Sequence, residues 1–238
     1  MKLLCLNCRG LGRPEAVREV HSLCELHCPW VVFLSETRFF SDRVDGLVST
    51  LGMEGGFGVG TRGQGGGLAL LWSREVTVKL ESYDRLHVDV TIRAVSSQFE
   101  EWRFTGFYGE SRRELRYRSW DLLNLLSSKS ELPWICVGDF NECLHAREQF
   151  GGQGRSERQM EGFQEAVEVC GFADLGYIGL PYTWDNRQQH GSNVKVRLDR
   201  RLVTAEFLNL FSVCQGLAYS NDRVGPLLFG VGMLTEGQ

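Results

Sequence analysis

Short apolar runs of the kind that form buried strands recur along the whole chain. Some run without interruption, as at residues 2–6, 31–34 and 134–137, which is typical of strands covered on both faces. Others alternate between apolar and polar positions or are shorter, and these lie at residues 76–80, 86–92, 102–108, 182–184, 195–200, 213–217 and 226–231. Strands therefore make up most of the regular structure that the sequence predicts.

Helical periodicity is confined to a few segments, at residues 14–26, 114–126, 159–170 and 205–211. Pro14 opens the first of them, where a missing N–H costs no hydrogen bond, and Gly171 follows the third as a residue that tolerates a left-handed cap. Residues 56–72 are rich in glycine, but no Gly-Lys-Ser/Thr and no helix follow, so they predict a hairpin turn. Runs of strands with few helices between them predict sheets packed on each other and covered by helices.

The size and composition of the chain favour one domain spanning residues 1–238. The 238 residues are 42% apolar, which suffices for a core, and no repeat, low-complexity tail or linker interrupts them. The first residues lack the long apolar stretch that is typical of a signal peptide, and no apolar run reaches the roughly 18 residues that cross a bilayer. We therefore expect a soluble intracellular protein with no membrane contact and no disulfide-linked partner, whose eight cysteines act mostly as small core hydrophobes.

Two cysteine spacings are similar to metal-binding motifs but favour a structural interpretation. Cys5 and Cys8 fall in a predicted strand, where positions i and i+3 point to opposite faces. The second group lies in a predicted amphipathic helix, and no further pair follows it at the spacing of a zinc finger. This group comprises His21, Cys24, His27 and Cys28.

The overall charge weighs against a nucleic-acid-binding protein. The net charge is −4, whereas such proteins gain affinity by neutralising phosphates with Lys and Arg. Basic residues nevertheless gather in two segments, one with Arg112, Arg113, Arg116 and Arg118 and the other with Lys195, Arg197, Arg200 and Arg201. Each segment is either an ordinary solvated face or a contact with nucleic acid, and the sequence leaves both interpretations open.

Polar side chains recur where the predicted strands end. They are Asn7, Glu36, Tyr108, Asp139, Asn141, Asp199 and, just before the last strand, Asp222. Strand ends are the places where a rigid scaffold can present several side chains to one pocket. Carboxylates and amides are oxygen ligands that suit Mg²⁺ or Mn²⁺. Each residue alone would be an ordinary turn or helix start, so the indication of a site comes from their joint occurrence.

Segments spread over nearly the whole chain resemble those of one domain. In order, they are KLLCLNCRGLG, FLSETR, GGGLALLW, FTGFYGE, LPWICVGDFNE, GFADLGYIGLPYTWDN and VRLDRRLVT. They resemble the endonuclease domain of plant LINE-type non-LTR retrotransposons, which is similar to AP endonucleases and belongs to the DNase-I-like endonuclease/exonuclease/phosphatase superfamily. The resemblance implies an α/β fold: a four-layer αββα sandwich of two mixed, mainly antiparallel sheets flanked by helices.

The resemblance also implies roles for the residues at the strand ends. Glu36 would be the chief ligand of Mg²⁺, with Mn²⁺ as the alternative, and Asn7 would lie beside it. Asp222 would approach the same metal. Asp139 would orient or deprotonate the attacking water, and Asn141 would hold the scissile phosphate.

Further roles concern the phosphate and the DNA. Tyr108 would hydrogen-bond a phosphate oxygen, and Asp199 would hold the family's catalytic histidine in the correct tautomer. The DNA groove would be contacted by Thr183, Trp184, Arg200 and Arg223.

The resemblance breaks at the family's last motif, a Ser-Asp-His followed two residues later by proline. Residues 220–226 here read SNDRVGP, and the chain contains no histidine after His190. Counted from the serine, the place of the histidine falls on Arg223, and counted back from the proline it falls on Val224. Losing a positioned acid or base typically costs about 10²–10⁴ in rate. Arg223 would supply positive charge but cannot exchange a proton near neutral pH.

The sequence therefore predicts a Mg²⁺-dependent phosphodiester hydrolase, a DNA endonuclease of retrotransposon origin that is impaired by the loss of this histidine. Two alternatives stay open: a catalytically inactive relic of the fold with weak nucleic-acid binding, and a phosphatase acting on small phosphate esters, which the acidic balance favours. The reverse transcriptase domain that follows in intact elements is absent from this chain. Genomic DNA as the substrate would imply a nuclear location.

Overall fold

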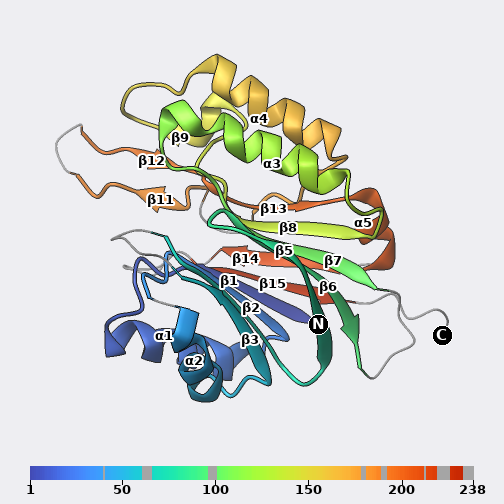
Figure 1. Cartoon of the computed structure of the whole chain (residues 1–238). Coiled ribbons are helices and arrows are strands. Elements are labelled where there is room, and N and C mark those ends of the chain that lie inside the picture. Colours follow the sequence, from blue (N-terminus) through green and yellow to red (C-terminus); the bar gives the residue numbers. More distant parts are fainter. Residues whose placement is uncertain are drawn as a thin grey trace.

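Two six-stranded sheets lie face to face in the computed structural model (Figure 1), which describes residues 1–39, 41–60, 66–95, 101–177, 181–188, 192–211, 213–218 and 226–232. The strand order of the first sheet is β14 (Val213–Ala218), β15 (Pro226–Gly232), β1 (Lys2–Asn7), β2 (Val31–Ser35), β4 (Leu68–Trp72) and β3 (Gly55–Val59). Strands β1 and β2 are parallel, and the other neighbouring pairs are antiparallel.

The second sheet has the same mixture of strand directions. Its order is β10 (Ala173–Asp174), β13 (Asp199–Val203), β8 (Trp134–Asp139), β7 (Trp102–Tyr108), β6 (His87–Ala94) and β5 (Val76–Tyr83). Only β7 and β8 are parallel within it. A small third sheet projects beside it, formed by β11 (Trp184–Asp185), β12 (Lys195–Val196) and β9 (Gln149–Phe150).

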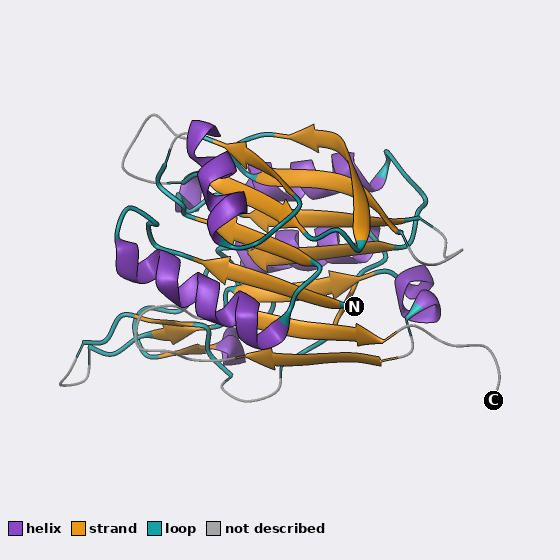
Figure 2. Cartoon of the chain, turned by 90° about the horizontal axis from the view of Figure 1, so that it is seen from below, coloured by secondary structure: helices purple, strands orange, loops and turns teal. Residues whose placement is uncertain are grey.

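Helices cover the outer face of each large sheet, as the views from the side and from below show (Figures 1 and 2). The first sheet is covered by α1 (Pro14–His27) and α2 (Val44–Thr50), and the second by α3 (Tyr117–Ser127) and α4 (Glu157–Val169). A short helix, α5 (Ala205–Leu210), follows β13. The predicted four-layer sandwich of two mixed sheets is confirmed. None of the described helices is long and apolar enough to cross a membrane.

The main core lies between the two sheets. Phe33 of the first sheet and Phe104 of the second meet edge to face with ring centroids 6.3 Å apart. Gly106 lies opposite the Phe33 ring, and a Cβ atom at this position would come within 2.2 Å of it. The glycine in the FTGFY segment therefore permits the close approach of the sheets.

The structure differs from the predicted elements in a few places. Helix α2 was not predicted, because seven residues show little periodicity. The strand expected at residues 134–137 continues through Gly138 to Asp139, and the one expected at 195–200 divides into β12 and β13. Seven cysteines are free, and all of these except the exposed Cys28 are buried, namely Cys5, Cys8, Cys24, Cys136, Cys143 and Cys170.

Candidate active site

Side chains from both large sheets meet at one edge of the sandwich, where β1, β2, β7 and β8 end. Asn7 Nδ2 donates hydrogen bonds to Glu36 Oε1 at 2.9 Å and to Asp139 Oδ2 at 3.1 Å. The Tyr108 hydroxyl donates to the same Glu36 oxygen at 3.2 Å. Four residues predicted from strand ends therefore form one hydrogen-bonded cluster. We call this cluster, together with Asn141 and Asp199, the active edge.

Strand register brings Asp199 to the active edge. In the pairing of β8 with β13, Asp139 lies opposite Asp199, and in the pairing of β7 with β8 it lies opposite Tyr108. Gly138 has φ +150°, and a Cβ atom there would lie 1.9 Å from the Phe107 carbonyl oxygen. Glycine is thus required before Asp139, because the backbone of β8 passes close to β7.

Left-handed backbone conformations are concentrated around this edge. Of the described non-glycine residues with positive φ, Cys28 caps α1, and the others are Arg9, Glu36, Arg38, Asn141 and Arg187. Such conformations cost roughly 1–3 kcal/mol each and persist only where the surroundings fix them. Asn141 is fixed by its backbone N–H, which donates to Asp139 Oδ1 at 2.9 Å, and by its side-chain amide, which donates to the Gly109 carbonyl at 2.7 Å.

Burial and mutual repulsion shape the electrostatics of the active edge. Burial raises the pKa of Asp139 to about 6, and the charge of Glu36 adds to the shift, while hydrogen bonds from Asn141 and Asn7 oppose it. Burial and the neighbouring Asp139 raise the pKa of Asp199 well above its ordinary range. Burial, with Glu36 and Asp139, also raises the pKa of the Tyr108 hydroxyl. The carboxylates thus face each other without a full compensating charge.

The donor set at this edge fits a hard divalent cation. Glu36 and Asp139 supply carboxylate oxygens and Asn7 an amide. Within the described residues, no three His, Cys, Asp or Glu side chains are arranged to hold a metal by themselves. The set of two carboxylates and one amide suits Mg²⁺, which is commonly held by one or two carboxylates and keeps several waters. The buried hydroxyl of Thr37, next to Glu36, has no hydrogen-bond partner in the described part of the chain.

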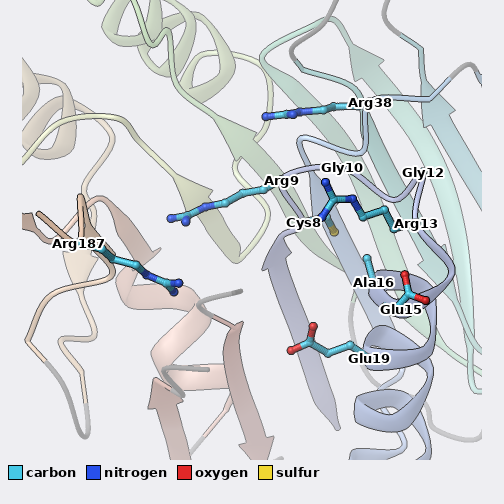
Figure 3. A pocket seen from close by; sticks show the side chains of 10 residues that line it. All are labelled: Cys8, Arg9, Gly10, Gly12, Arg13, Glu15, Ala16, Glu19, Arg38 and Arg187. Atoms are coloured by element: carbon cyan, nitrogen blue, oxygen red, sulfur yellow. The ribbon is translucent and has the colours of Figure 1, made fainter. Parts of the chain in front are cut away.

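A cleft of about 620 Å³ opens beside the active edge (Figure 3). Four arginines line it, namely Arg9, Arg13, Arg38 and Arg187, together with Glu15 and Glu19. Sequence reasoning missed these arginines. The signal that could have found two of them is position, because Arg9 and Arg38 each lie two residues after a predicted metal ligand.

Comparison with known families shows the family of the chain. The model of the endonuclease/exonuclease/phosphatase family matches residues 4–220. The chain belongs to that family. The predicted resemblance to the superfamily is thereby confirmed, whereas the narrower origin in a plant element stays a prediction.

Solved structures from this family share the fold over nearly the full length. The endonuclease domain of TRAS1, a telomere-specific non-LTR retrotransposon, is 14% identical with a TM-score of 0.72, and the match covers 98% of this chain and 99% of that one. An AP endonuclease from Archaeoglobus fulgidus is 14% identical with a TM-score of 0.72, covering 97% and 99%. The 3′-5′ exonuclease NExo from Neisseria meningitidis is 16% identical with a TM-score of 0.68, covering 98% and 100%. A search of curated proteins found no significant match.

Not every residue that the sequence predicted to contact DNA lies at the surface. Arg200 is wholly buried, and its guanidinium donates to Asp174 at 2.7 Å and to both carboxylate oxygens of Glu148. Arg197 also bridges these two carboxylates, at 2.8 and 3.2 Å. The predicted contact of Arg200 with DNA is therefore wrong, because the side chain is consumed by this buried ion network of Glu148, Asp174, Arg197 and Arg200.

The two basic segments differ in burial, because Arg112, Arg113 and Arg118 of the first are exposed whereas most of the second is buried. Arg116 is buried and pairs with Glu142 at 2.8 Å, and Arg197, Arg200 and Arg201 are buried as well. These four buried arginines lie in the interior of the fold and are not available to a ligand.

The other residues predicted to contact DNA or the metal differ in their surroundings. The Thr183 hydroxyl accepts hydrogen bonds from the backbone N–H groups of Leu198 and Asp199, at 2.9 and 3.0 Å, so it fixes the start of β13. Trp184 is 36% exposed on β11 and is free to contact a ligand. Asp222 and Arg223 lie outside the described residues.

Proposed function

We propose that this chain hydrolyses phosphodiester bonds of DNA with Mg²⁺, as an endonuclease of retrotransposon type. The observation that carries the proposal is the hydrogen-bonded cluster of Asn7, Glu36, Tyr108 and Asp139 beside an arginine-lined cleft. The folds of the TRAS1 endonuclease domain and of AP endonucleases support it. A structure of NExo described as a 3′ phosphatase bound to product DNA shows the same fold acting on nucleic acid.

Glu36 and Asn7 would hold the metal, with Asp139 beside them and Asp222 as a further proposed ligand. When bound, Mg²⁺ would supply Lewis-acid stabilisation of the charge that develops on the phosphate. A cation at this edge would also relieve the repulsion that raises the pKa of the buried carboxylates.

Asp139 would accept the proton of the attacking water. A pKa of about 6 leaves the Asp139 carboxylate ionised at neutral pH, and a bound cation would favour the ionised form further. Asn7 and the Asn141 backbone N–H each bind one of its oxygens, which fixes the direction of the carboxylate. The Tyr108 hydroxyl and the Asn141 amide would hydrogen-bond phosphate oxygens, and Trp184 would contact the DNA.

The missing histidine would reduce the rate. Asp199 keeps its place beside Asp139, but the chain has no histidine after His190 to pair with it. A lost proton donor costs about 10²–10⁴ in rate. We therefore propose a slow nuclease, with Arg223 contributing charge in place of the imidazole.

Nicking of supercoiled plasmid tests this function. We expect Mg²⁺-dependent nicking that EDTA abolishes and that Asp139→Asn reduces by at least about 10²-fold. Asp121→Asn is the matched control, since Asp121 is exposed on α3 and far in sequence from the active edge. Equal nicking by wild type and Asp139→Asn would contradict the proposal.

Two other functions have specific support. The net charge of −4 favours a small phosphate ester over DNA, and the missing histidine favours a non-catalytic protein with weak nucleic-acid binding. Faster release of phosphate from inositol phosphates than nicking of plasmid would support the phosphatase. DNA binding without hydrolysis of either substrate would support the non-catalytic protein.

A further inference from the structure

Arg9 extends from a rigid loop into the cleft beside the active edge (Figure 3). Its backbone N–H donates to Asn7 Oδ1 at 3.3 Å, and its φ of 48° is left-handed. The next residue, Gly10, donates its N–H to the Glu36 carbonyl at 2.8 Å. The backbone of Arg9 is thereby tied to both proposed metal ligands, so its side chain has a fixed origin.

Gly10 sets the neighbouring arginine as well. Its φ is +107°, and a Cβ atom there would lie 3.3 Å from the Arg38 side chain. Arg38 lies across this glycine and pairs with Glu36 Oε2 at 3.5 Å. Arg9 and Arg38 therefore lie on two loops that are hydrogen-bonded to each other, one after β1 and one after β2, but only Arg38 pairs with a carboxylate.

The guanidinium of Arg9 differs in its partners from the interior arginines. Arg103, Arg116, Arg197 and Arg200 each pair with a carboxylate within 3.2 Å. Among the described residues, Arg9 has no carboxylate within ion-pair distance and is exposed. Arg9 is nevertheless close enough to interact electrostatically with the buried carboxylates of Asp139 and Asp199. An arginine in this position is available to an anion that lies in front of these carboxylates.

We propose that Arg9 binds the non-bridging oxygens of the reacting phosphate and adds its fixed positive charge to that proposed for Arg223, in the absence of the family's histidine. This inference rests on the proposed phosphodiesterase function. Arginine presents a planar fork that matches two phosphate oxygens, and it stays charged at every physiological pH. A fixed donor stabilises the charge that develops on these oxygens in the transition state. The proton for the leaving oxygen then comes from water.

Further arginines of the cleft are placed to contact neighbouring phosphates of a DNA strand. Arg187, beside β11, lines the same cleft and extends toward the same opening as Arg9 (Figure 3). Arg13 lines it further along, at the start of α1. Glu15 and Glu19 also belong to the lining, but Glu15 pairs with Arg18 at 2.9 Å. Neighbouring phosphates of one strand would thus have Arg13 or Arg187 as partners, with Arg9 nearest the carboxylates.

The test combines binding with turnover in the full chain. Binding of a labelled DNA duplex is measured in EDTA over a range of salt concentrations, and nicking of plasmid is measured with Mg²⁺ at saturating enzyme. We expect Arg9→Gln to lower the slope of log affinity against log salt by about 1, as for one lost phosphate contact. We expect the same variant to nick at least about 10²-fold more slowly, since one lost donor to a developing oxyanion has that effect. Arg9→Lys should retain part of the rate, because the charge remains and the fork is lost.

Two variants separate the role of Arg9 from general charge. Arg13→Gln should also lower the salt slope, and it should lower the saturated nicking rate far less than Arg9→Gln does. Arg18→Gln, on the outer part of α1, should change neither quantity. A salt slope and a saturated rate that are both unchanged in Arg9→Gln would overturn the proposal. A changed slope with an unchanged saturated rate would also overturn it, since the bound phosphate would not be the reacting one. A wild-type chain that does not nick but whose salt slope depends on Arg9 would contradict the proposed function while supporting the phosphate contact.

Discussion

Buried carboxylates occur in two regions of this molecule with opposite surroundings. In the buried ion network, burial would raise the pKa of Glu148 and of Asp174, but the adjacent guanidinium groups hold both values below their ordinary range. At the active edge, burial and neighbouring carboxylates raise the pKa of Asp139 to about 6 and hold that of Asp199 well above its ordinary range. A carboxylate buried against arginine belongs to the scaffold, whereas carboxylates buried against each other mark the site that a cation and a phosphate would occupy.

The largest effect should come from removing charge at the active edge. Glu36→Gln keeps the shape of the side chain but removes the anionic metal ligand, so we expect nicking to fall by about 10³-fold, a loss of several kcal/mol of transition-state stabilisation. Mg²⁺ should raise the melting temperature of the wild type and not that of the variant, which thermal unfolding checks. Glu161→Gln, at an exposed position on α4, is the control and should behave as wild type. Unchanged nicking by Glu36→Gln would remove the active edge from the mechanism.

The opposite result is expected in the buried ion network. Arg200→Met leaves Glu148 and Asp174 with only Arg197, and breaking a buried pair from one side costs about 3–5 kcal/mol of unfolding free energy. Urea unfolding measures this loss. Arg18→Met removes an exposed ion pair and should cost below about 1 kcal/mol. If the two variants were equally stable, the network would not hold the scaffold together.

A smaller effect concerns Glu110, which follows β7. The hydrogen bond from Arg112, with help from Arg85, outweighs the effect of burial and lowers its pKa from 4.5 to about 2. The stabilisation is therefore complete above pH 4.5 and is lost as the pH falls toward 2. Glu110→Gln should lose about 1–2 kcal/mol at pH 6, since both arginines are half exposed and screened, and less at pH 3. Urea unfolding at the two pH values checks this, and a loss that grows on acidification would contradict it.

Much of the fold could be predicted from apolar runs, because a buried strand leaves a direct pattern in the sequence. Strand β7 was predicted with its observed bounds, and the ends of β1 and β8 differ by one and two residues. The end of β8 was missed because Gly138 reads as a terminator, whereas it is the glycine that lets the strand pass close to Phe107.

The active edge could be predicted only in part. Asn7, Glu36, Tyr108 and Asp139 were found because strand ends and family motifs mark them. Whether an arginine is exposed or buried could not be predicted, because the local sequence looks the same in both cases. Arg200 pairs with carboxylates that lie 26 and 52 residues away in the sequence. The left-handed backbone at Arg9 and Glu36 is likewise set by tertiary contacts that no local pattern reveals.

The most direct test of the account follows one variant, Asp139→Asn, in two measurements at once. Because the pKa of Asp139 is raised from 3.8 to about 6, its ionisation removes stability as the pH rises through this range, by about 3 kcal/mol in total. In EDTA, we expect the urea midpoint of wild type relative to that of the variant to fall as the pH rises from 4 to 7.5, because only the wild type carries the buried charge, and we expect the variant to lose nicking with Mg²⁺. Asp121→Asn should change neither quantity. A stability difference between the two chains that does not change with pH, or a variant that still nicks DNA, would contradict the claim that this edge keeps its carboxylates for chemistry.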